Sequence, residues 1–216
     1  MKVTRIAEIE PIVVAGELRW HPLRRTLGIE AFGINAYTAN AGQLVVEEHD
    51  ETGAGAGHHE EVYVVIAGHA TFTVDGRDVD APAGMCVFLD DPKERRGARA
   101  TQDGTTVLAV GGTRGEAFRV SPWEYAFGAV PAFEAKRYDE AKELLVEGLR
   151  AHPGNTSLLY NLACVEALSG ETEPALEHLE QAFADPRTRE WAKDDKDLDS
   201  LRDDPRFSSA LESPPG

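Results

Sequence analysis

The sequence predicts two domains of different class, an all-β barrel followed by an all-α array of helical hairpins. Up to about residue 112, short β-branched runs alternate with glycines, prolines and an Asp-Gly pair, which is typical of many short strands. From about residue 124, apolar residues recur at spacings of three and four, which is typical of amphipathic helices. A length of 216 residues leaves room for two small domains. We therefore expect domains at 1–120 and 121–212, with a disordered tail at 213–216.

The charge of the chain excludes several classes of partner. The sequence has 22 basic and 38 acidic residues, for a net charge of -16. Such a chain would repel phosphate backbones and anionic membrane faces, so we expect no nucleic-acid or membrane partner. The first residues lead into Glu8 and Glu10 rather than into an apolar signal sequence, and we expect a cytoplasmic protein. Cys86 and Cys164 each lie in an apolar stretch, and we expect both thiols to be buried.

The β half can be divided into strands in order along the chain. Four strands are predicted at 62–66, 70–74, 85–89 and 105–110. Asp75-Gly76 predicts a tight turn directly after the second of them. Before these strands, the segment 19–28 could cap the barrel or add an edge strand from a second subunit.

The helical half begins with a plausible N-cap at Ser121 and a proline, Pro122, at the first helical position. Pro131 interrupts the apolar pattern of 123–136, which predicts a kink or a break in that helix. Near the C-terminus, short acidic helices are expected to close the domain, with four apolar side chains facing inward: Trp191, Leu198, Leu201 and Phe207.

Two motifs in the β half resemble those of the cupin family. Glu61 and Gly68 have the spacing of the glutamate and glycine in the first cupin motif, and 76–84 contains the Pro-x-Gly turn of the second. The resemblance covers roughly residues 30–112. It implies a double-stranded β-helix, also called a jelly-roll barrel.

In cupins, two histidines, the glutamate and a later histidine converge on a divalent metal, but this sequence departs from that pattern. Counted back from Glu61, the histidine pair would fall on Gly55 and Gly57. Counted forward from Gly42, it would fall on Glu48 and Asp50, with His49 between them. In a regular strand His49 would point to the opposite face, and only a bulge would turn it inward.

The later histidine of the family corresponds best to Arg95, whose guanidinium cannot replace that ligand. The remaining candidates for metal ligands are His59 and Glu61, with His49 or Glu48 as a third. Imidazole and carboxylate ligands suit Fe, Mn, Ni or Zn. The alternative is that 58–61 is a polar loop and that Glu61 forms a salt bridge with Arg95 or Arg96.

Other side chains could line a ligand pocket. Arg95 and Arg96 could hold an anionic ligand at the barrel mouth through bidentate hydrogen bonds. Tyr63 is in phase with Glu61 along its strand and could line the cavity.

The helical half resembles a pair of tetratricopeptide repeats. Residues 138–148 align with 172–182 at a period of about 34, the spacing of that family. Small residues recur where helices approach closely, as at Ala141 and Ala175 and again at Gly148 and Ala182. The resemblance implies a protein or peptide partner at these repeats.

These observations leave two classes of function open. The first is a non-enzymatic, ligand-binding or regulatory barrel fused to a protein-interaction module, with a small molecule in the barrel. The second is a metal-dependent cupin enzyme, a dioxygenase or isomerase, that uses His49, His59 and Glu61. Whether the protein is an enzyme stays open at this point, and we expect a homodimer because the barrel has exposed edges and a long N-terminal extension.

Overall fold

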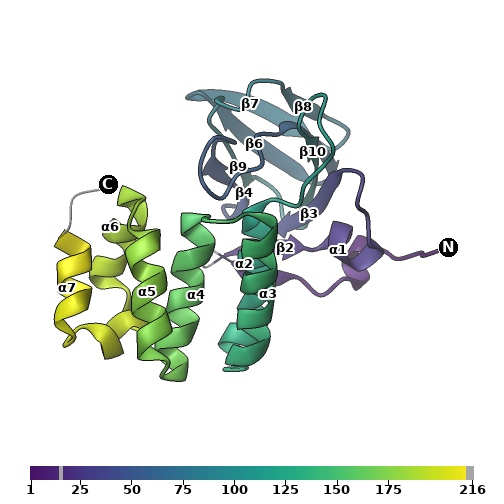
Figure 1. Ribbon diagram of the computed structural model, residues 1–216. Helices are drawn as coiled ribbons and strands as arrows, with labels where there is room; N and C mark the ends of the chain where they lie inside the picture. Colours follow the sequence, from purple (N-terminus) through teal and green to yellow (C-terminus); the bar gives the residue numbers. More distant parts are fainter. Residues whose placement is uncertain (15–16, 213–216) are drawn as a thin grey trace. The chain divides into compact units, whose positions relative to one another are not determined.

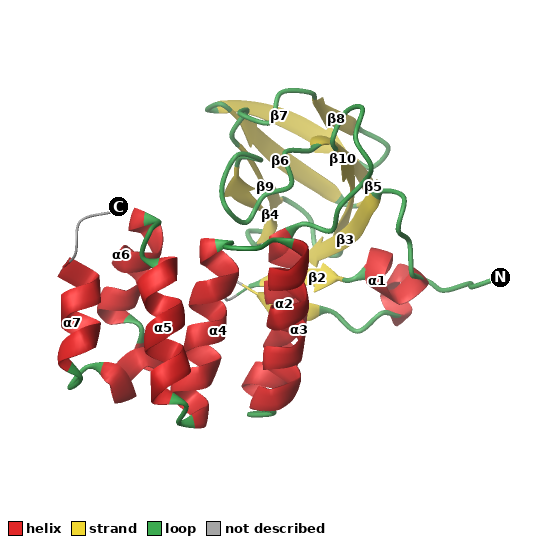
Figure 2. Cartoon of the chain, in the orientation of Figure 1, coloured by secondary structure: helices red, strands yellow, loops and turns green. Residues whose placement is uncertain are grey.

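The computed structural model describes residues 1–14 and 17–212 (Figure 1). The chain divides into two compact units, Met1–Val120 and a second unit that begins at Ser121. The first unit is built of strands and the second of helices (Figure 2), so the predicted order of an all-β part followed by an all-α part is confirmed. The tail predicted at 213–216 lies outside the described residues.

The strands of the first unit form two antiparallel sheets. Their orders are β1-β2-β3-β10-β5-β8 and β4-β9-β6-β7. From β3 the chain runs out to the β6–β7 hairpin and returns, so that β3, β4 and β5 pair with β10, β9 and β8. This is the pairing pattern of a jelly roll. The strands are β1 (Ile12–Val14), β2 (Leu18–His21), β3 (Gly33–Ala39), β4 (Leu44–His49), β5 (Glu60–Ala67), β6 (His69–Val74), β7 (Arg77–Pro82), β8 (Cys86–Leu89), β9 (Arg96–Ala100) and β10 (Thr105–Gly112).

The barrel core consists of alternate residues along these strands. Tyr63, Val65 and Phe72 are buried and pack together, because every second side chain of a strand points to the same face. Asp75 and Gly76 both have positive φ angles, 47° and 75°, and form the two-residue turn between β6 and β7. The predicted turn is therefore confirmed.

The N-terminal segment extends one sheet of its own chain. β2 pairs with β3, and β1 pairs with β2. The side chain of His21 is buried and contacts the Ile9 carbonyl oxygen (2.8 Å) and the Thr38 hydroxyl (3.0 Å). A short helix, α1 (Leu23–Leu27), follows, and the 3-10 helix η1 (Ile6–Glu8) precedes β1.

The second unit is a row of helices, with α4 between α3 and α5 (Figure 1). The helices are α2 (Pro122–Glu134), α3 (Tyr138–Ala151), α4 (Thr156–Ser169), α5 (Thr172–Ala182), α6 (Pro186–Asp194) and α7 (Pro205–Glu212), with the 3-10 helix η2 (Lys196–Leu201) before α7. The sequence predicted a kink or a break at Pro131, and the structure shows no break. α2 runs through Pro131 and ends at Glu134, within one turn of the proline.

Close approach between the helices depends on a small residue at Gly148. A Cβ atom at this position would lie 2.9 Å from Cγ of Tyr125 and 3.0 Å from Cδ1 of Leu158. The equivalent position in the second hairpin, Ala182, is fully buried. The small residues that recur at a period of about 34 therefore mark helix contacts.

The closing helices bury three of the four apolar side chains that were expected to face inward. Leu198, Leu201 and Phe207 are buried. Trp191 is 48% exposed, and its ring lies against that of Tyr160 at 5.6 Å, so the prediction for Trp191 is wrong. In the described part of the chain, every helix is too short or too polar to cross a bilayer.

The two cysteines differ in their environment, which corrects the expectation that both are buried. Cys86 is exposed on β8, the edge strand of its sheet, whereas Cys164 is buried in α4. Burial and the nearby Asp195 carboxylate raise the pKa of the Cys164 thiol well above its usual value. We expect the native protein to react with about one equivalent of a thiol reagent and the unfolded protein with about two, because the thiolate is the reactive form. Native Cys86→Ser should remain unlabelled, and rapid labelling of that variant would contradict this assignment.

Candidate functional site

A cluster of polar side chains lies inside the barrel around Glu61. Glu61 is on β5, two residues before Tyr63, and both side chains point inward. The Tyr63 hydroxyl donates a hydrogen bond to Oε2 of Glu61 at 2.6 Å. Burial and the adjacent carboxylate raise the pKa of Tyr63 well above its usual value, so Tyr63 stays a neutral donor.

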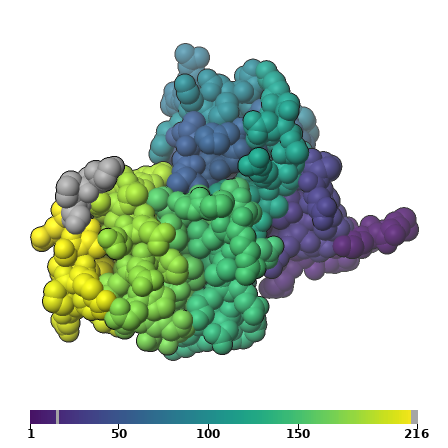
Figure 3. All heavy atoms as spheres, viewed as in Figure 1, coloured from purple at the N-terminus to yellow at the C-terminus, as the bar shows by residue number. Residues whose placement is uncertain are grey.

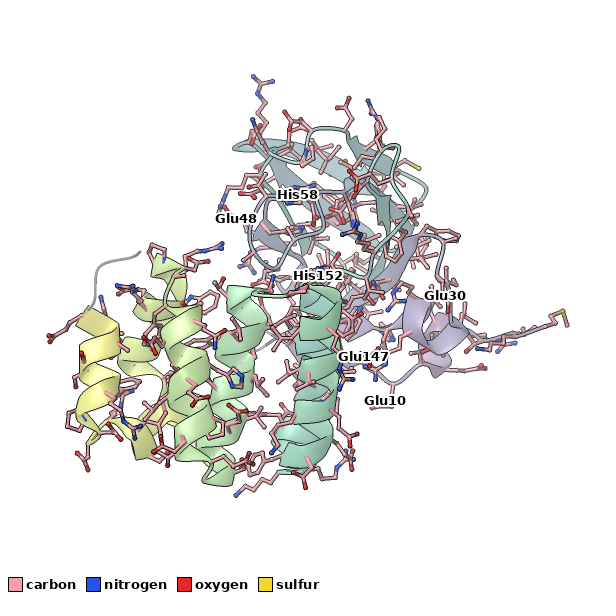
Figure 4. All side chains as sticks on the ribbon, in the orientation of Figure 1. Glu10, Glu30, Glu48, His58, Glu147 and His152 are labelled. Atoms are coloured by element: carbon pink, nitrogen blue, oxygen red, sulfur yellow. The ribbon has the colours of Figure 1, made fainter. Side chains whose placement is uncertain are left out.

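His49 reaches the same carboxylate because β4 contains a bulge. Val46 pairs with Ala98 and His49 with Arg96, so β4 has one more residue than β9 in this stretch. The extra residue turns His49 inward, and it leaves Glu48 outside, where it forms an ion pair with Arg95 (Figure 4). Nε2 of His49 lies 3.8 Å from Oε2 of Glu61. The bulge that His49 needs in order to point into the barrel is therefore present in β4.

The charges of His49 and Glu61 support each other. Burial disfavours the imidazolium, but the Glu61 carboxylate, the Glu47 carbonyl oxygen and the Glu51 carboxylate together outweigh this effect, so the pKa of His49 is raised. Burial likewise disfavours the Glu61 carboxylate, but His49, Tyr63 and Arg96 outweigh it, so the pKa of Glu61 is lowered. We expect Glu61 to be ionised at neutral pH.

Arg96 is the buried cation of the cluster. Its side chain is fully buried (0% exposed) on β9, directly opposite His49. Nη1 donates to the Glu94 carbonyl oxygen at 2.8 Å, and Nη2 lies 3.4 Å from Oε2 of Glu61. Within the described residues, Nε and Nη2 have no hydrogen-bond acceptor. Arg95, which the cupin resemblance aligned with the later histidine, points outward to Glu48, whereas Arg96 points inward to Glu61.

Glu51 completes the cluster, and no motif or periodicity in the sequence pointed to it. Its side chain is buried, and its Oε1 lies 3.6 Å from Nε2 of His49. Its other oxygen accepts hydrogen bonds from the backbone N–H groups of Gly57 (2.9 Å) and His59 (3.4 Å). These hydrogen bonds hold the glycine-rich loop between β4 and β5 in place.

The structure places His59 apart from the other predicted ligands. His59 precedes β5 and follows His58, whose φ angle is +55° (Figure 4). The His59 ring packs against that of Phe118, with the ring centroids 5.5 Å apart. The ligand atoms of His49, Glu51 and Glu61 lie within 4.8 Å of one another, and His59 belongs to no such group in the described residues.

The donor set fits a divalent metal in part. One imidazole and two carboxylates suit Fe, Mn, Ni or Zn. However, Oε2 of Glu61 already accepts from Tyr63, and the Arg96 cation lies beside it. A metal ion bound to that oxygen would be close to a buried positive charge, which is costly in a low-dielectric interior.

Comparison with known families gives a match in the helical unit. Residues 132–193 match the tetratricopeptide repeat family. This match confirms the predicted tetratricopeptide resemblance for the segment from α2 to α6. No curated protein sequence matches the chain.

Solved structures similar to the chain are cupins, and they correspond to its N-terminal half. An RmlC-like cupin from Desulfovibrio desulfuricans is 24% identical, with 51% of this chain and 95% of that chain covered and a TM-score of 0.39. A predicted oxalate decarboxylase from Thermotoga maritima is 21% identical, with 51% and 97% covered and a TM-score of 0.41. A cupin from Bacteroides fragilis is 20% identical, with 53% and 92% covered and a TM-score of 0.38.

Proposed function

We propose that the barrel of this protein binds a small polar ligand without catalysing a reaction, and that the tetratricopeptide-like helices dock a protein or peptide. The observation that carries this proposal is Arg96. A fully buried guanidinium lies next to Glu61 inside the barrel, directly opposite His49 on the neighbouring strand. A guanidinium has five N–H donors and no lone pair for a metal.

The polar cluster offers donors to a ligand at its accessible side. The His49 side chain is 35% exposed, and those of Glu61, Glu51 and Arg96 are much less exposed. A ligand would therefore meet the imidazole of His49 first. Two nitrogens of Arg96, Nε and Nη2, have no hydrogen-bond acceptor in the described structure, which favours a ligand with carboxylate, carbonyl or hydroxyl oxygens.

A metal-dependent enzyme of the dioxygenase or isomerase class is the second candidate. The observation that favours it is the proximity of the ligand atoms of His49, Glu51 and Glu61, all within 4.8 Å of one another. A divalent metal held there would supply Lewis-acid or dioxygen chemistry. In that case Tyr63 would orient Glu61 through its hydrogen bond. The homodimer and the cytoplasmic location remain predictions.

Metal analysis of the tag-free protein distinguishes the two candidates. We expect much less than one Fe, Mn, Ni or Zn per chain, both as purified and after incubation with each ion followed by desalting. Near-stoichiometric metal that is lost in Glu61→Gln and His49→Gln would overturn the non-enzymatic proposal. His59→Gln is the matched control, because His59 lies outside the ligand group.

Native mass spectrometry of the same preparations tests ligand binding. We expect a co-purified small molecule, or binding of one from a panel of small carboxylates and sugars, that is weakened in Arg96→Lys. This variant keeps the positive charge but loses the two-pronged donor geometry. Ligand binding that is unchanged in Arg96→Lys would contradict the role of Arg96.

A further inference from the structure

A groove runs along the helical unit between α3 and α4. Its volume is about 910 Å³, and it is lined by α3 and by Leu162 and Glu166 of α4. Val146 is half-buried and Leu162 is buried, so these two side chains form an apolar floor. A smaller hollow of about 600 Å³ also has Asp139 in its wall and extends towards Leu168.

The walls of this groove carry an excess of negative charge. Four carboxylates line it, against Lys142 and Arg150. Lys142 forms ion pairs with Glu171 and with Asp139 (3.6 Å), and Glu166 pairs with His178 (2.7 Å), so Glu143 and Glu147 are the carboxylates left to a partner. Glu143 and Glu147 are exposed on α3, where Figure 4 labels Glu147, and neither belongs to an ion pair among the described residues. From residue 121 onward the sequence has 10 basic and 20 acidic residues, so the surroundings of the groove are also negative.

The geometry suits an extended basic segment. From Asp139 to Arg150 the helix rises about 16 Å, at about 1.5 Å per residue, which matches five residues of extended chain at about 3.3 Å each. Glu143 and Glu147 are one turn apart, so their side chains start about 6 Å from each other. Alternate side chains of an extended peptide lie on one side at nearly the same spacing.

We propose that the groove between α3 and α4 docks an extended segment of a partner protein with the pattern basic-apolar-basic. The basic side chains pair with Glu143 and Glu147, and apolar side chains of the segment contact Val146 and Leu162. This inference rests on the proposed docking function of the helical unit and assigns it a surface and a chemical class of partner. It is independent of the ligand site in the barrel.

Fluorescence anisotropy with the full-length protein tests the proposal. The probe is a fluorescein-labelled pentapeptide, Leu-Arg-Leu-Arg-Leu, and its counterpart is Leu-Glu-Leu-Glu-Leu. We expect the arginine peptide to bind and the glutamate peptide not to bind. Binding should weaken at least about tenfold in the double variant Glu143→Gln/Glu147→Gln, and it should weaken with added salt. The matched control is Glu177→Gln/Glu180→Gln on α5, which removes the same charge from exposed positions outside the groove.

Three results would overturn the proposal, and circular dichroism of each variant shows that it is folded. If both double variants bind the arginine peptide equally, the helical unit docks peptides at another surface and the proposed function stands without this groove. If neither peptide binds, the groove is not a docking site for basic segments. If sedimentation shows a dimer that Glu143→Gln/Glu147→Gln dissociates, a second copy of the chain occupies the groove instead.

Discussion

Arg96→Ala is expected to lower the free energy of unfolding of the barrel by about 3 to 5 kcal/mol, because it leaves a buried carboxylate without its cation. Arg96 is fully buried beside Glu61, and its Nη1 also satisfies the Glu94 carbonyl oxygen. With Arg96 removed, Glu61 must stay charged without this partner or take up a proton. The measurement is urea unfolding in a Trp123→Phe/Trp191→Phe background, in which the fluorescence comes from Trp20, buried in the barrel unit.

Arg95→Ala is the control for this prediction. Arg95 is the preceding residue and its ion pair with Glu48 is exposed to solvent, so we expect a loss much smaller than that in Arg96→Ala. The double variant Arg96→Met/Glu61→Met should recover part of the stability lost in Arg96→Ala, since an apolar pair can replace a buried ion pair. Equal losses in Arg95→Ala and Arg96→Ala would show that Glu61 does not depend on Arg96.

Gly68→Ala is expected to destabilise the barrel by about 3 to 4 kcal/mol, from backbone strain and a steric clash together. Gly68 lies in the turn between β5 and β6 with a φ angle of +73°. A Cβ atom there would lie 2.6 Å from Cα of Thr105, which is backbone and cannot rotate away. Thr105 itself holds the turn, because its hydroxyl donates to the His69 carbonyl oxygen at 2.9 Å.

Gly76→Ala separates the clash from the strain. Gly76 has nearly the same φ angle, +75°, but a Cβ atom there would meet nothing within 4 Å. We expect this variant to cost about 1 to 2 kcal/mol, the strain alone. Thermal unfolding of both variants measures the difference, and a Gly68→Ala variant no less stable than Gly76→Ala would refute the clash.

The architecture could be predicted from local sequence patterns, because each pattern is typical of one kind of local structure. A two-residue hairpin turn requires positive φ angles at both central residues, and Asp75-Gly76 is a pair that tolerates them. The spacing of Glu61 and Gly68 predicted a strand that ends in a turn. In the structure that turn needs a glycine, because the contact with Thr105 leaves no room for a side chain at Gly68. In the helical half, the recurrence of small residues at Gly148 and Ala182 marked positions where neighbouring helices pack closely.

The polar cluster was only partly predictable because it depends on register. One extra residue between Val46 and His49 decides that His49 rather than Glu48 faces Glu61, and no local pattern marks that bulge. The sequence likewise did not show which of the two neighbouring residues, Arg95 or Arg96, faces the barrel interior. Glu51 acts from a loop through contacts to Gly57 and His59, where periodicity carries no information. The expectation that His59 shares the site with Glu61 assumed a regular strand, but β5 begins only at Glu60.

The return path of the barrel strands also has a consequence for how the chain acquires its structure. β3 pairs with β10, so that Ala36 lies opposite Leu108, and this contact closes a long loop of chain. The helices pair mainly with their sequence neighbours, as Figure 3 shows in the ordered colours of the helical row. High contact order slows folding, whereas local contacts form within microseconds to milliseconds. The barrel, although synthesised first, is therefore the slower half to fold, and its strand edges stay exposed to aggregation until β10 is in place.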